Sequence, residues 1–224
     1  MNTHRRPQSR RPQGRRGFSL IELMVVVAVA VLIISLAAPS FSEYIVTQRV
    51  RSVHAQLVTD IQYARSEAAS RGQVVAIQFE HMPGAGGHSC YTIYARDSGA
   101  NPRHCSCLET DGSVKPEGTR CAFADTEEIR SVVIENSLKV WVQADAGLVS
   151  GITAPHKPVV NFDPRTGSSI QGASPPYPAT MAADGVRVFT QADSSRALGV
   201  VVNGVGRALV CTPAGSNLGG LPCP

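Results

Sequence analysis

The pattern of apolar positions predicts one long helix at the start of the chain. Residues 18–38 form a nearly continuous apolar run, about as long as a helix that crosses a bilayer. Between residues 46 and 68, apolar side chains recur at spacings of four and three, which is typical of one face of an amphipathic helix. We therefore expect a single helix over residues 18–71, transmembrane over about 18–38, with a kink or a locally melted turn at Pro39.

After Gly72 the period of the apolar positions changes to two, which predicts a β-rich domain over residues 72–224. Strands are expected at residues 73–80, 91–96, 129–142 (one or two strands), 159–162, 186–190, 197–202 and 207–211. A polar, cysteine-rich insertion is expected over residues 97–127, and an exposed loop over 171–184. The predicted fold class is α+β, with the long helix packed on an antiparallel sheet domain.

A basic leader precedes the apolar run and accounts for the positive net charge of the whole chain. Residues 1–17 hold six arginines and no acid. The whole chain has 21 Lys and Arg against 17 Asp and Glu, a formal charge of +4, and loss of the leader would leave 15 against 17, or −2. Such a mature chain is not a generally basic nucleic-acid binder, so any anion site must be a local patch.

A single acid, Glu22, lies inside the apolar run. A carboxylate in hydrocarbon is costly unless a cation neutralises it, so we expect Glu22 to pair with a positive group on another copy of the protein. An ordinary secretory signal has its apolar core before the cleavage site, whereas here the core follows the basic leader and would stay on the mature protein.

The segment Gly17–Glu22, GFSLIE, resembles the class III signal of type IV pilins and type II secretion pseudopilins. The resemblance implies that a prepilin peptidase cuts between Gly17 and Phe18 and methylates the new amine of Phe18. It also implies that Glu22 pairs with this amine on a neighbouring subunit during assembly. The implied location is the inner membrane, crossed once, with the leader cytoplasmic and the C-terminal domain periplasmic. The alternative is a plain single-pass anchor.

Five further segments narrow the resemblance to FimT/GspH-type minor pilins. They are residues 37–41 (AAPSF), 63–68 (YARSEA), 71–74 (RGQV), 161–167 (NFDPRTG) and 201–207 (VVNGVGR). The resemblance covers both ends of the chain and does not extend over 97–127 or 171–184. It implies a pilin-like fold and a fibre subunit that assembles with major and minor pilins on an inner-membrane platform.

The cysteines all lie beyond the apolar run, where an exported domain meets an oxidising compartment, so disulfides are expected. They are Cys90, Cys105, Cys107, Cys121, Cys211 and Cys223. A Cys211–Cys223 bridge would resemble the disulfide-bounded loops of pilins, and Cys90 and Cys121 would then take Cys105 and Cys107 in either order. Cross-pairing between the insertion and the tail stays open.

A metal site is the alternative to disulfides, with His81, His88 and His104 close in sequence to the cysteines. The spacing Cys105-x-Cys107 is shorter than that of a usual zinc knuckle. We therefore expect no metal.

The turn near the C-terminus, at residues 206–209, could form a DNA-binding site. FimT-type DNA receptors resemble one another in a GRxR motif whose two arginines bind phosphates, and this chain has Gly206-Arg207-Ala208-Leu209. The first arginine is present, and Leu209 replaces the second. Candidates that would complete a phosphate-binding patch are Arg187, Arg196, Arg165 and Lys157. The competing interpretation is a solvated arginine after a turn glycine.

Catalysis is not expected. His54, Asp60 and Ser66 fall on one helix and do not by themselves form a nucleophilic triad, and the sequence has no P-loop, HExxH or Gly-x-Ser-x-Gly motif. Trp141, Tyr91 and Tyr94 are interpreted as core or sheet residues and not as a platform for bases. No cofactor is implied.

Three functions remain, and all three are non-enzymatic. The first is a FimT-like minor pilin that takes part in the assembly or priming of a type IV pilus. The second is a GspH-like pseudopilin of a type II secretion system, and the third is a pilus tip subunit that captures DNA for uptake.

Overall fold

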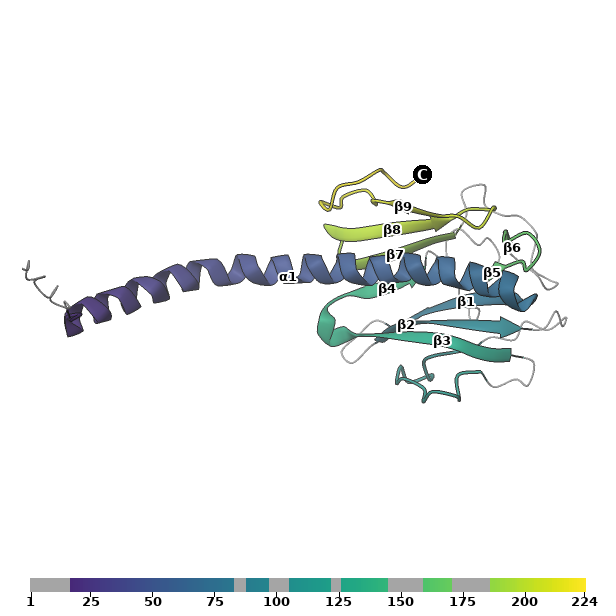
Figure 1. Cartoon of the computed structure of the whole chain (residues 1–224), viewed down its shortest axis with the longest axis horizontal. Helices are drawn as coiled ribbons and strands as arrows, with labels where there is room; N and C mark the ends of the chain where they lie inside the picture. The colour runs from purple at the N-terminus through teal and green to yellow at the C-terminus, as the bar shows by residue number, and fades with distance from the viewer. Residues whose placement is uncertain (1–16, 83–87, 97–104, 122–125, 145–158, 171–185) are drawn as a thin grey trace, which may run out of the picture. The chain divides into compact units, whose positions relative to one another are not determined.

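The computed structural model describes residues 17–82, 88–96, 105–121, 126–144, 159–170 and 186–224. The expected leader, the loop 171–184, His104 and Lys157 therefore lie outside the described residues, apart from Gly17 at the end of the leader. The chain divides into two compact units, Met1–Ser42 and Glu43–Pro224, and each is considered by itself. The predicted α+β class is confirmed, because an N-terminal helix is followed by two antiparallel sheets (Figure 1).

The helix α1 runs from Leu20 to Arg71, and its assignment passes through Pro39 without a break, so the kink at Pro39 stays a prediction. Gly72 ends it. Its φ of 66° is a left-handed value that suits glycine, and its N–H donates to the carbonyl oxygen of Ala68 over 3.1 Å. In the second unit the inward face of α1 is the one that the sequence predicts: Val50, Leu57, Ile61, Ala64 and Ala68 are fully buried.

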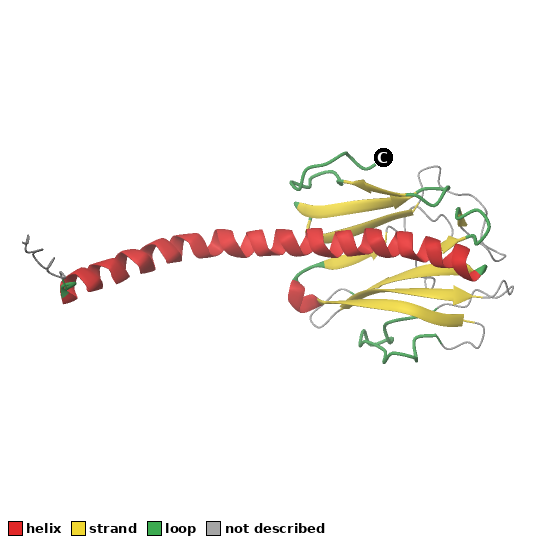
Figure 2. Cartoon of the chain, viewed as in Figure 1, coloured by secondary structure: helices red, strands yellow, loops and turns green. Residues whose placement is uncertain are grey.

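The strands form two antiparallel sheets that lie behind the second half of α1 (Figure 2). The first has the order β3 (Thr126–Glu135), β2 (His88–Arg96), β1 (Val74–His81), β5 (Val159–Phe162), β6 (Ser169–Ile170). The second has the order β4 (Trp141–Ala144), β7 (Val186–Asp193), β8 (Arg196–Val202), β9 (Ala208–Cys211). A short 3-10 turn, η1 (Asn136–Leu138), separates β3 from β4, so the predicted segment 129–142 supplies strands to both sheets.

The main core lies between α1 and one face of both sheets. It contains Leu57 and Ile61 of the helix, Ile77 and Phe79 of β1, and Val200 of β8. Odd-numbered residues of β1 point into this core, because side chains alternate along a strand.

The opposite face of β1 and β2 is buried as well. Ala76, Gln78 and Glu80 lie on this face of β1 and are at most 4% exposed. Residues 105–121 of the cysteine-rich insertion cover it, since Cys105 packs with Ala76 and Tyr94. The insertion therefore turns the first sheet into a layer that is covered on both sides.

Three disulfides are present: Cys90–Cys107, Cys105–Cys121 and Cys211–Cys223. The C-terminal bridge is the one that the pilin resemblance implies. Of the two orders left open for the insertion, the structure takes the one in which Cys107 joins β2.

Candidate functional site

The first part of α1 presents apolar side chains that nothing in the described part of the chain covers. Phe18 is 80% exposed and Leu20 is 75% exposed. Most of the large apolar residues up to Ile34 are exposed in the same way. Glu22 lies in the first turn of α1, where Leu23 N–H already donates to the Ser19 carbonyl oxygen over 3.1 Å. A carboxylate at a helix N-terminus is placed to meet positive charge.

Within the described residues, no helix combines the length and apolarity needed to cross a membrane.

A second feature lies at the other end of α1, where three of the segments that resemble minor pilins meet. The helix segment 63–68, the β5–β6 turn and the β8–β9 turn enclose a groove of about 690 Å³. We call it the arginine groove, and it is lined by Gln62, Arg65, Ser66, Ala69, Pro164, Arg165, Thr166, Gly167, Gly206, Arg207, Ala208 and Leu209. These segments are far apart in sequence, so their convergence is a tertiary property.

The β5–β6 turn is shaped by Asp163. Its Oδ1 atom accepts the backbone N–H groups of Arg165 at 2.8 Å and Thr166 at 2.9 Å, as well as the Thr166 hydroxyl at 3.1 Å. The backbone hydrogen bonds from Thr166 and Arg165 lower the pKa of Asp163 below its usual value. The turn therefore holds Arg165 at the rim of the groove.

The β8–β9 turn is shaped by Asn203 and Gly206. The Asn203 side chain accepts the Arg207 N–H at 2.9 Å, and the Asn203 carbonyl accepts the Gly206 N–H at 2.8 Å. Gly206 has a φ of 75°, and a Cβ there would lie 2.1 Å from the Gly167 carbonyl oxygen. Only glycine allows the two turns to approach this closely.

Arg65 joins the helix to both turns. Its Nε donates to the Gly167 carbonyl oxygen over 2.9 Å, and the side chain is half-buried. Arg65 therefore links α1 to Gly167 of the β5–β6 turn, which in turn lies against the Gly206-Arg207 pair of the β8–β9 turn. The sequence alone did not show that Arg65 belongs to this site.

Two of the groove's guanidinium groups face solvent. Arg165 and Arg207 are exposed, and none of the described residues that line the groove is an acid. Within the described residues neither of them forms a salt bridge. The groove therefore has the charge and access that an anionic partner needs.

The other sequence candidates lie elsewhere. Arg196 is paired with Asp193, and hydrogen bonds from Arg196 and Ser195 lower the pKa of Asp193 to about 2. Arg187 is on β7 and does not line the groove. Leu209 pairs with Val201, which pairs with Arg187, so these three side chains share the sheet face opposite the core. An arginine at position 209 would share this face with Arg187, with Val201 between them and a backbone separation of about 10 Å, or two strand spacings.

The three residues of α1 that were considered for a nucleophilic triad, His54, Asp60 and Ser66, lie in different local environments. Asp60 accepts the Tyr91 hydroxyl at 2.7 Å and pairs with Arg130 at 2.9 Å. The Ser66 hydroxyl donates to the Tyr63 carbonyl. His54 is only 4% exposed, and neither ring nitrogen has a hydrogen-bond partner within the described residues.

The aromatic residues behave as expected of structural positions. Tyr91 and Tyr94 are buried, and the Trp141 ring stacks on His81 with centroids 6.1 Å apart. None of these rings forms an open surface for bases.

Comparison with known proteins gives two matches to family models. Residues 55–206 match the model of the type II transport protein GspH, and residues 12–38 match the prokaryotic N-terminal methylation motif. The first match covers more than half of the chain. The chain belongs to the GspH family.

The GspH family consists of pilin-like structural subunits, and together with the methylation motif it makes this protein a pilin-like or pseudopilin-like fibre subunit. Membership implies assembly with other pilins and processing by a prepilin peptidase. No curated protein and no solved structure matches the chain.

Proposed function

We propose that the chain is a FimT-like minor pilin that takes part in the assembly or priming of a type IV pilus. The observation that carries this proposal is an exposed apolar helix segment with a single acid, Glu22, both inside the residues that match the methylation motif. In this proposal the peptidase cuts after Gly17, the segment anchors the protein once in the inner membrane, and the domain faces the periplasm.

The assembly step follows from electrostatics in an apolar surrounding. The apolar side chains of α1 pack against the helices of neighbouring pilins, where an unpaired carboxylate is strongly disfavoured. Glu22 gains a partner only when the N-terminal amine of Phe18 on an adjacent subunit lies beside it. The pair therefore sets the axial position of each subunit.

The test compares Glu22→Ala with Glu43→Ala, a second exposed acid on the same helix. Glu22→Ala should lower the amount of the protein recovered in sheared fibres at least about tenfold, because it leaves the amine of Phe18 on the adjacent subunit buried without its partner, at a cost of about 3–5 kcal/mol. Its amount in membranes should stay unchanged. Normal recovery in fibres would overturn the role of Glu22.

The processing step has its own measurement. Mass spectrometry of the protein from membranes should show a chain that begins at Phe18 with a methylated amine. An uncut leader in cells with an active prepilin peptidase would overturn the proposal as a whole.

A type II secretion pseudopilin is the second candidate, favoured by the family model that matches residues 55–206. The two candidates share the same assembly physics and differ in the system they serve. Deletion of the gene should reduce surface pili if the first is right. Loss of exoprotein secretion with normal pili would favour the second.

DNA capture is the third candidate, favoured by the arginine groove. Arg165 and Arg207 present two exposed cations on adjacent turns, and Arg65 adds a third from the helix. Phosphate contacts carry no base information, so Arg207→Ala should weaken binding of all duplex sequences alike, and added salt should do the same. A gel-shift titration at several salt concentrations measures the effect of the substitution and the effect of salt on DNA affinity. An affinity that does not change with salt concentration would contradict binding through phosphate contacts.

A further inference from the structure

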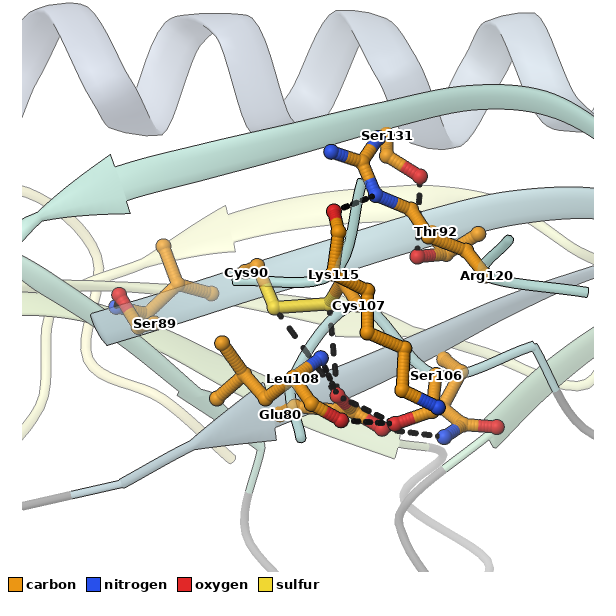
Figure 3. Close-up of a disulfide and its surroundings, with 12 residues drawn as sticks. Glu80, Ser89, Cys90, Thr92, Ser106, Cys107, Leu108, Lys115, Arg120 and Ser131 are labelled. Carbon is orange, nitrogen blue, oxygen red and sulfur yellow. Dashed lines mark hydrogen bonds between the residues drawn. A yellow bond between two sulfur atoms is a disulfide. The ribbon is translucent and has the colours of Figure 1, made fainter. Parts of the chain in front are cut away.

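A buried carboxylate lies against the disulfide that ties the insertion to the sheet. Glu80 is 4% exposed, and its Oε2 atom is 3.5 Å from the Cys107 Sγ and 4.0 Å from the Cys90 Sγ (Figure 3). Glu80 and Cys90 are also direct cross-strand partners in the β1–β2 ladder, so their side chains share one face.

The same carboxylate also holds the backbone around Cys107. Its Oε2 accepts the Leu108 N–H at 2.8 Å and the Ser106 hydroxyl at 3.1 Å, and Oε1 accepts Gln78 Nε2 at 2.7 Å. Residues on both sides of Cys107 are therefore fixed to β1 by contacts that do not need the disulfide.

Cys90 and Cys121 can take Cys105 and Cys107 in either order, and loop entropy does not choose between these two orders. The observed bridges, Cys90–Cys107 and Cys105–Cys121, close sequence separations of 17 and 16 residues. Exchange of Cys105 and Cys107 would close loops of nearly the same length, and closure entropy varies only slowly with length. The choice must therefore come from the local environment.

The two candidate sulfurs differ in their surroundings. Cys105 packs with Ala76 and Tyr94 in a small apolar cluster. Cys107 lies within S–H···O distance of Glu80. Glu80, Cys90 and Cys107 bring possible metal-ligand atoms within 4.8 Å of one another, but both sulfurs are used in the disulfide and neither is a thiolate.

We propose that Glu80 directs the oxidative pairing of Cys90 with Cys107. In the dithiol state both thiols donate to its carboxylate, which gathers these two sulfurs and leaves Cys105 to Cys121. Glu80 also serves as the base for closure, since the thiolate is the reactive form of cysteine and burial in apolar surroundings disfavours it.

The chemical step requires a disulfide-bearing oxidant, such as oxidised glutathione or a thiol–disulfide oxidoreductase. The Cys90 thiolate first attacks one sulfur of the oxidant and forms a mixed disulfide. The other oxidant sulfur leaves as a thiolate and takes up the proton that Cys90 lost, so one thiol is released. Cys107 then gives its proton to Glu80, and its thiolate attacks the Cys90 sulfur. The second oxidant sulfur leaves as a thiolate and takes the proton from Glu80. Two cysteines lose two electrons in total, and one oxidant disulfide becomes two thiols.

The test uses the full chain in detergent, reduced, unfolded and then refolded in a glutathione redox buffer, with the bridges mapped by mass spectrometry of unreduced peptides. Glu80→Gln should slow formation of Cys90–Cys107 at least about tenfold and yield the exchanged bridges Cys90–Cys105 and Cys107–Cys121. Glu80→Asp should partly restore both rate and pairing. Glu109→Gln, an exposed acid two residues from Cys107, is the matched control and should behave as wild type. Native pairing of Glu80→Gln at the wild-type rate would overturn the proposal.

A second measurement applies to the unmodified protein, in case Glu80→Gln does not fold. Resolution of a mixed disulfide at Cys121 by Cys105 should quicken about tenfold per pH unit from pH 6 to 8, as the Cys105 thiolate forms. Resolution of the Cys90 mixed disulfide by Cys107, the step that Glu80 assists, should change by less than about threefold per unit. Equal slopes for the two bridges would contradict the role of Glu80 as a base.

Discussion

Asp60 of α1 and Tyr91 of β2 are joined by a buried hydrogen bond of 2.7 Å. Asp60 is 1% exposed, and its other oxygen meets Arg130 of β3 at 2.9 Å. Burial and the neighbouring Asp60 raise the pKa of Tyr91 well above its usual value, so the phenol stays a donor. This contact fixes the rotation of the helix against the first sheet.

We predict that Asp60→Ala destabilises the domain by about 2–3 kcal/mol, because it leaves the Tyr91 hydroxyl buried without its acceptor. The measurement is urea denaturation of the full chain in detergent, followed by near-UV signals of the domain. Glu117→Ala, which removes an exposed carboxylate, is the control and should change stability by less than about 0.5 kcal/mol. An equal loss of stability in both variants would show that the hydrogen bond between Asp60 and Tyr91 does not contribute specifically to the stability of the domain.

Stability should fall in mild acid because of His54. Burial lowers the pKa of His54 from its ordinary 6.5 to about 4. Between these pH values the unfolded chain binds a proton that the folded chain does not, so stability is complete above pH 6.5 and is lost as the pH falls towards 4. The loss should reach about 3 kcal/mol, since each pKa unit corresponds to about 1.4 kcal/mol.

The measurement for His54 is the urea midpoint at pH 7, 6, 5 and 4. His54→Leu should remove most of the slope in this range. His81→Gln, at a less buried histidine whose pKa burial also lowers, should keep the larger part of it. A slope that persists in His54→Leu would place its origin in other groups.

Gly206→Ala should disrupt the arginine groove. The new Cβ would lie 2.1 Å from the Gly167 carbonyl oxygen, and the backbone would also be strained by its positive φ. We expect a loss of at least about 2 kcal/mol from strain and displacement together. Gly72→Ala is the control, because Gly72 has a similar φ of 66° and nothing within 4 Å of its Cβ position. It should cost only about 1 kcal/mol. Equal losses would mean that the close approach of the turns is unimportant.

Leu209→Arg tests the DNA candidate by a gain of binding. Position 209 shares a sheet face with Arg187 across Val201, so the variant adds a second cation to that face, about 10 Å from the first. We expect duplex DNA to bind several-fold more tightly at low salt, with the salt dependence steeper by about one counterion. Val210→Arg, on the opposite face of the same strand, is the control. An equal gain from both would indicate net charge alone, and no gain would argue against a phosphate site there.

Much of the fold is visible in local patterns. The 3.6-residue period between residues 46 and 68 predicted the buried face of α1, and Gly72 predicted its end. The alternation in β1 predicted a strand because side chains of successive residues must point to opposite faces. These features depend on the backbone geometry of one element, so a short stretch of sequence is enough to specify them.

The sequence by itself determined the helix, most of the strands, the apolar segment with Glu22 and the processing signal, but not the short strand β6 or the first residues of β3. Only the tertiary structure decided that the insertion buries Glu80, that Cys107 and not Cys105 joins Cys90, and that Arg65, Arg165 and Arg207 line one groove. Each of these depends on contacts between segments distant in the chain, and no local periodicity encodes which distant segments meet when the sheets and the helix pack.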